Sequence, residues 1–204
     1  SGVFEGHTTG TPISILVRNQ DQKSHDYSNI MNTYRPGHAD YTFDAKYGFR
    51  DYRGGGRSSG RETIGRVAAG AVACKILESL GIQVMAYAKS IGPISIPEQD
   101  YDYSVITDNT LYMPNNQYAE KASAYLEECI RSQDSSGGII ECRVEHMPAG
   151  IGETVFEKLD ANLAKAMMSI GAVKGFEIGD GFQAAKASGS QNNDAFSSNS
   201  DGIY

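Results

Sequence analysis

The chain has 204 residues, the size of one ordinary domain, and 40% of them are hydrophobic, which is enough for a packed core. Its 25 acidic and 18 basic residues give a net charge of −7, which argues against a general nucleic-acid-binding surface. No apolar run approaches the roughly 20 residues of a membrane span, so no membrane partner is expected. The three cysteines form no CxxC pair and no metal-ligand spacing appears, so we expect reduced thiols, no metal site and a cytoplasmic protein.

The first third of the chain combines one strand-like run with a long irregular stretch. The β-branched run 12–18 predicts a strand. Regular patterning then stops from 19 to 59, and compact domains rarely hold so long a stretch unless it is functional. We therefore expect a functional loop region over 19–59. A helix follows over about 60–80, because apolar residues recur on one face: Ile64, Val67, Ala68, Ala71 and Val72.

This helix carries signals at both ends, and further elements follow it. Ser59 is a plausible N-cap with Glu62 at capping-box spacing, and Gly81 fits the position just after the C-terminus. The remaining pattern predicts strands over 82–89, 139–146 and 172–178 and helices over 117–133 and 154–170. This order predicts an α+β domain with helices packed on a sheet. The polar tail 188–204 has no period and is expected to be flexible.

The densest chemical feature is the segment 50–61, which reads Arg-Asp-Tyr-Arg-Gly-Gly-Gly-Arg-Ser-Ser-Gly-Arg. Its glycines let the backbone approach a ligand closely, and its arginines can grip anionic oxygens. The segment runs into a helix N-terminus, which favours an anion. A phosphate site is one interpretation. The other is a solvated loop whose arginines pair with Asp40, Asp44 and Asp51, and the residues alone leave both open.

A second motif places a histidine between opposite charges. His38 follows a Pro-Gly turn and lies between Arg35 and Asp40 in the sequence. Such a histidine is a candidate proton donor, although a lone histidine is more often structural or merely exposed.

At these two motifs the sequence resembles the chorismate synthase family, and the resemblance continues in order along essentially the whole chain. The segments that carry it are 1–15, 18–27, 35–42, 46–48, 51–63, 158–161, 171–182 and 189–194. The resemblance implies a sandwich of helices between antiparallel sheets, of which residues 1–204 form the central part of a single domain. It also implies a homotetramer for the full enzyme.

The resemblance further implies an activity. Family members are carbon–oxygen lyases of the shikimate pathway, which leads to aromatic amino acids. They convert 5-enolpyruvylshikimate 3-phosphate to chorismate by 1,4-anti-elimination of phosphate. The reaction requires reduced FMN without net redox change, and the family is also associated with NADPH. The chain is thus expected to be part of a flavoprotein lyase.

Site residues carry over from the family by position. His38 matches the catalytic histidine near the flavin, which is proposed to donate a proton to the reduced flavin, and Arg35 and Arg61 match substrate-binding arginines. The positions that match FMN-binding residues are Arg57, Ser58, Ser59, Gly60, Gly171 and Ala172.

The family pattern also predicts what the chain lacks. Members carry a Gly-Glu-Ser-His segment with a second catalytic histidine, and a C-terminal flavin loop and catalytic aspartate, none of which occurs here. We therefore expect the chain alone to be inactive. The alternative function is a non-catalytic fragment that binds a phosphate ligand or serves oligomerisation.

Overall fold

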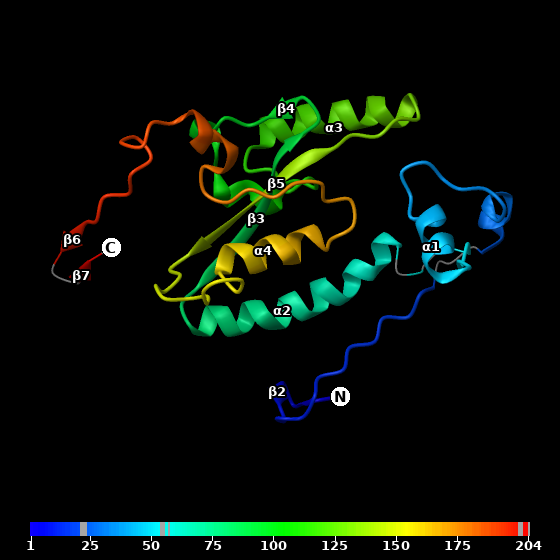
Figure 1. Ribbon diagram of the computed structural model, residues 1–204, viewed down its shortest axis with the longest axis horizontal. Helices are drawn as coiled ribbons and strands as arrows, with labels where there is room; N and C mark the ends of the chain where they lie inside the picture. The colour runs from blue at the N-terminus through cyan, green and yellow to red at the C-terminus, as the bar shows by residue number, and fades with distance from the viewer. Residues whose placement is uncertain (21–23, 54–55, 57, 200–201, 204) are drawn as a thin grey trace. The chain divides into compact units, whose positions relative to one another are not determined.

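The computed structural model describes residues 1–20, 24–53, 56, 58–199 and 202–203 (Figure 1). The chain divides into two compact units, which are described separately. Unit 1 comprises Ser1–Ala68 and Gly150–Tyr204, and unit 2 comprises Ala69–Ala149. Helices and small antiparallel sheets occur in both units, so the predicted α+β class is confirmed. Among the described residues, no helix combines the length and apolarity needed to cross a membrane.

Unit 1 consists of short elements joined by long connections. Its two small sheets are the antiparallel pairs β1–β2 and β6–β7. Its elements are β1 (Val3–Phe4), β2 (His7–Thr8), the 3-10 helix η1 (Ser24–Ile30), α1 (Asp40–Tyr47), the 3-10 helix η2 (Gly60–Thr63), the start of α2 (Ile64–Ser79), α4 (Leu159–Met168), the 3-10 helix η5 (Gly181–Lys186), β6 (Ser198–Asn199) and β7 (Gly202–Ile203).

Unit 2 is built on a three-stranded antiparallel sheet in the order β4-β3-β5. Val84 of β3 pairs with Val144 of β5, and the two strands run together over most of their length. Helix α3 contacts β4 (Figure 1). The elements are the end of α2, β3 (Gln83–Ile91), β4 (Ile94–Ser95), the 3-10 helices η3 (Glu98–Asp100) and η4 (Tyr103–Asp108), α3 (Asn116–Arg131) and β5 (Gly138–Glu145).

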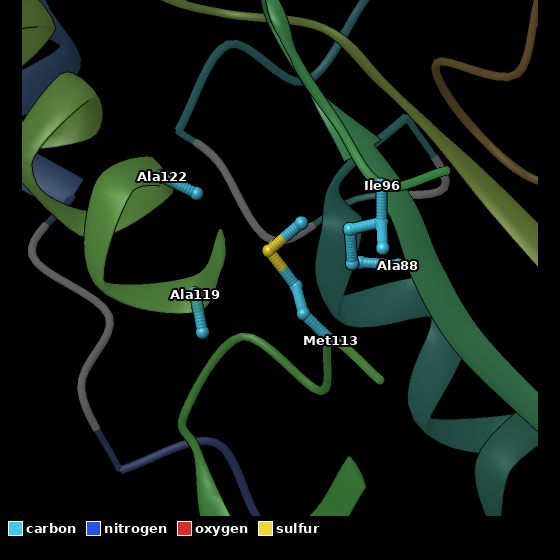
Figure 2. Packing of buried hydrophobic residues seen from close by; sticks show 5 residues of the cluster. All are labelled: Ala88, Ile96, Met113, Ala119 and Ala122. Atoms are coloured by element: carbon cyan, nitrogen blue, oxygen red, sulfur yellow. The ribbon is translucent and has the colours of Figure 1, made fainter. Parts of the chain in front are cut away.

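A small apolar core holds the helix of unit 2 to its sheet. The Met113 side chain is fully buried, and Figure 2 shows it between Ala119 and Ala122 of α3 on one side and Ala88 and Ile96 on the other. Small alanines on the helix leave room for the flexible methionine, which fills irregular gaps well. The strands predicted over 82–89 and 139–146 and the helix over 117–133 are confirmed within about two residues at their ends.

The helix predicted over 60–80 is confirmed as η2 continued by α2. The Ser59 hydroxyl accepts a hydrogen bond from the Arg61 backbone N–H at 3.2 Å, so Ser59 caps the helix as expected. The Glu62 carboxylate pairs with Arg66 one turn further on. Gly81 adopts a left-handed φ of 79° after the last turn, where glycine has no steric penalty.

Two predicted strands are absent from the described residues. Residues 12–20 form no strand, and Ile15, Leu16 and Val17 are exposed. A β-branched run becomes a strand only where a partner completes its backbone hydrogen bonds, and none of the described strands pairs with this run. Residues 173–178 also form no strand, and they follow Ala172, whose φ of 70° turns the chain.

Two helices differ from their predicted extents. Helix α1 lies inside the stretch 19–59, for which the sequence predicts an irregular loop. The sequence of α1 has no apolar stripe, so its pattern gives no helix signal. The helix ends at Gly48, whose φ is 80°. The helix predicted over 154–170 begins only at Leu159, since Glu153 and Glu157 instead form a bridged turn just before it.

Candidate functional site

The first group of site residues is organised by a buried carboxylate at the start of α1. Asp40 is 5% exposed. It accepts hydrogen bonds from the Arg35 backbone N–H at 3.0 Å, from Nε at 2.9 Å and from Nη2 at 2.8 Å. These bonds from Arg35 hold the pKa of Asp40 well below its usual range. The same bonds raise the pKa of Arg35, so the pair stays ionised and fixes the guanidinium plane.

His38 is oriented by both members of this ion pair. Its Nδ1 lies 3.1 Å from Arg35 Nη2 and 3.2 Å from Asp40 Oδ1. The first partner is a donor and the second an acceptor, so the ion pair holds the Nδ1 edge of the ring in either tautomer. In the protonated imidazole, Nδ1–H faces the Asp40 carboxylate. The side chain is 31% exposed, so a ligand can reach the ring.

Two arginines of the segment 50–61 are engaged in structural pairs. Arg50 contacts Asp44 at 2.6 Å and lies over the Tyr34 ring at 4.9 Å. Arg53 pairs with Asp51 at 2.8 Å. Arg50 also donates to three backbone carbonyls, those of Ile30, Met31 and Thr33. The pairing with aspartates that the solvated-loop interpretation predicts is therefore found for Arg50 and Arg53, and the mostly buried Arg50 braces the loop.

The remaining residues of this segment lie at the start of the long helix. Ser58 is exposed and Ser59 half-buried, and Gly60 begins η2. A side chain added at Gly60 would meet no atom within 4 Å, so its surroundings are open. Arg61 follows as an exposed residue. Arg57 lies outside the described residues.

The last predicted positions, Gly171 and Ala172, follow the C-terminal end of α4. Arg66 connects them to the start of the long helix, because its Nη2 donates to both the carbonyl oxygen and Oγ of Ser169 at 3.1 Å. Glu62 holds the other nitrogen of Arg66. The structure thus links Glu62, which follows the segment 58–61, to Ser169, which lies two residues before Gly171.

Sequence reasoning did not single out Arg66. Its i,i+4 spacing from Glu62 signals a helical ion pair. Nothing in the sequence signals the contact with Ser169, which lies 103 residues away. The structure therefore shows Arg35 with His38 as one group, and Arg66 as a link between Glu62 and Ser169, near the other predicted positions.

The fold and site define an α+β protein whose candidate ligand-binding residues are arginines, serines and glycines around a helix start. Comparison with known proteins narrows this class to one family. The family model described as Chorismate synthase matches residues 1–203. The chain is 67% identical over 196 residues to a chorismate synthase of Agathobacter rectalis, covering 96% of this chain and 53% of that protein. It is 63% identical over 202 residues to one of Lachnoclostridium phytofermentans, covering 99% and 55%.

A solved structure agrees with these relatives. The crystal structure titled "Crystal Structure of Chorismate Synthase" superposes with a TM-score of 0.83 at 33% identity, covering 100% of this chain and 61% of that one. The chain belongs to the chorismate synthase family. It spans about half the length of the curated relatives that it matches.

Proposed function

We propose that this chain contributes to an enzyme that eliminates phosphate from 5-enolpyruvylshikimate 3-phosphate to give chorismate, with reduced FMN as cofactor. The match to the chorismate synthase family over residues 1–203 carries the proposal. From the same membership we propose a cytoplasmic homotetrameric lyase, with NADPH as the associated reductant.

Arg35 and Arg61 are the proposed substrate-binding residues. The substrate carries a phosphate and carboxylates, and guanidinium groups bind such anions with several directed hydrogen bonds. The Asp40 pair holds Arg35 in one orientation, so Arg35 loses little conformational entropy on binding. Arg61 stands at a helix start, where the dipole adds to its charge.

His38 is the proposed proton donor. Both members of the ion pair contact the ring at Nδ1, Arg35 at 3.1 Å and Asp40 at 3.2 Å. The orientation of the ring therefore leaves Nε2 as the atom that donates to a ligand.

The residues present fit the flavin group. Hydroxyls of Ser58 and Ser59 and a helix N-terminus are the donors that a phosphate prefers. Open space at Gly60 and Gly171 permits a flat ring to approach the backbone, and Ala172 adds only a methyl group. By family position Arg57 belongs to the same set. When bound, reduced FMN would lend the electron that helps phosphate to leave, with no net redox change.

A chimera tests the function. The segment of the Agathobacter rectalis relative that aligns over 196 residues would be replaced by the matching residues of this chain. Phosphate release would then be measured anaerobically with 5-enolpyruvylshikimate 3-phosphate and dithionite-reduced FMN. We expect turnover, with a loss of about 100-fold or more for His38→Ala. His146→Asn is the matched control, because asparagine tolerates the φ of 60° at that position. A chimera without turnover beside an active parent would refute the proposal.

A further inference from the structure

We propose that Arg66 is a positioning residue that holds the two proposed flavin-contacting segments, 58–60 and 171–172, at one spacing. This inference rests on the proposed function, because it concerns the same flavin site. It adds a residue that makes no contact with the ligand itself and acts through its neighbours.

The contacts of Arg66 lie beside the two segments, at Glu62 and Ser169. Its Nη1 pairs with the Glu62 carboxylate, and Glu62 directly follows Arg61. Its Nη2 donates to the carbonyl oxygen and to Oγ of Ser169, which stands two residues before Gly171. One rigid guanidinium plane therefore spans the gap between segments that are far apart in the sequence.

The oxygen atoms of Ser169 that accept hydrogen bonds from Arg66 are held in place at the C-terminal end of α4. The Ser169 hydroxyl donates its hydrogen to the Ala166 carbonyl at 2.6 Å, which turns the oxygen lone pairs toward Arg66. Three residues later Ala172 adopts a φ of 70°, a conformation that costs energy for a residue with a side chain. Anchoring Ser169 holds the turn in which this conformation occurs.

The combined contacts with Glu62 and Ser169 require an arginine at position 66. A lysine at position 66 keeps the charge next to Glu62, but its three N–H donors sit on a single nitrogen and form no planar fork. It therefore cannot bind Glu62 and both oxygens of Ser169 in the same geometry. This difference separates a positioning role from a simple charge effect.

The test uses the 204-residue chain and FMN titrated by the change in flavin fluorescence. We expect Arg66→Gln to raise the FMN Kd about tenfold and Arg66→Lys to raise it less, since one charged contact remains. Ser169→Ala removes the hydroxyl but keeps the backbone carbonyl, and it should raise the FMN Kd about threefold. This variant tests the same contact if the Arg66 variants fold poorly. Arg131→Gln removes a helical arginine paired with Glu128 and should leave the Kd unchanged.

Hydrogen exchange without flavin supplies the second readout. In Arg66→Gln we expect faster exchange of the amides at 170–173, with α1 and α3 unchanged. An FMN Kd within twofold of wild type would overturn the inference, as would unchanged exchange at 170–173 or faster exchange throughout unit 1. A wild-type chain that does not bind FMN is a different result, visible before any variant is made. It would overturn the proposed flavin site and the inference with it.

Discussion

Replacing Asp40 with alanine should loosen the site without disturbing unit 2. Asp40 is buried and accepts three hydrogen bonds from Arg35, each of them charge-assisted. A net value of about 1.5–3 kcal/mol is usual for a hydrogen bond to a charged group. The Arg35 side chain is 31% exposed, so water recovers part of this loss when the carboxylate is removed. We therefore expect a cost of about 2 kcal/mol in the free energy of opening α1.

Hydrogen exchange of α1 measures this cost locally. The amides of Phe43 and Gly48 donate to the Ala39 and Asp44 carbonyls, so they exchange only when the helix opens. A loss of about 2 kcal/mol corresponds to exchange about 30-fold faster.

The matched control is Asp51→Ala. The pair of Asp51 with Arg53 is exposed on both sides, at 52% and 60%, and should contribute little to stability. Exchange in α1 that changes less than threefold in Asp40→Ala would refute the view that this carboxylate organises the site.

Three further predictions concern stability and can be measured by urea unfolding. Ser59→Ala should cost about 1 kcal/mol, because the Arg61 N–H loses its cap, whereas Ser59→Gly should cost a few tenths. Met113→Ala should cost about 2–5 kcal/mol in unit 2, because the side chain is fully buried in the core. The pKa of Asp40 is lower in the folded than in the unfolded chain, so its stabilisation is complete above about pH 4 and is lost as the pH falls below that value. The loss between pH 6 and pH 3 should therefore be smaller in Asp40→Asn than in wild type.

The parts of the fold that could be predicted are those with local signals. The helix after Ser59 has an apolar face, a cap and a terminal glycine, and each of these acts within a few residues. The strands of unit 2 have the alternation and bounding turns that a sheet requires. Helix α1 has a terminal glycine, Gly48, but neither an apolar face nor a side-chain cap. The run 12–18 has strand propensity without a partner among the described strands.

The candidate site likewise contains contacts that the local sequence predicts and contacts that only the tertiary fold creates. The grouping of Arg35, His38 and Asp40 follows from six consecutive residues around a turn. The contact of Arg66 with Ser169 joins elements that only the tertiary fold brings together, and no spacing rule predicts it. Family resemblance predicts that 58–60 and 171–172 serve one flavin site, and the contact of Arg66 with Ser169 near them is visible only in the structure.

The most direct measurement for this account is the footprint of FMN on the chain by hydrogen exchange. If the start of the long helix and the turn after α4 hold one flavin, FMN should slow exchange in both 58–63 and 170–173. Helix α3 of unit 2 should be unaffected. Protection of only one of the two segments, or protection elsewhere with neither, would contradict the assignment of one flavin site to these residues.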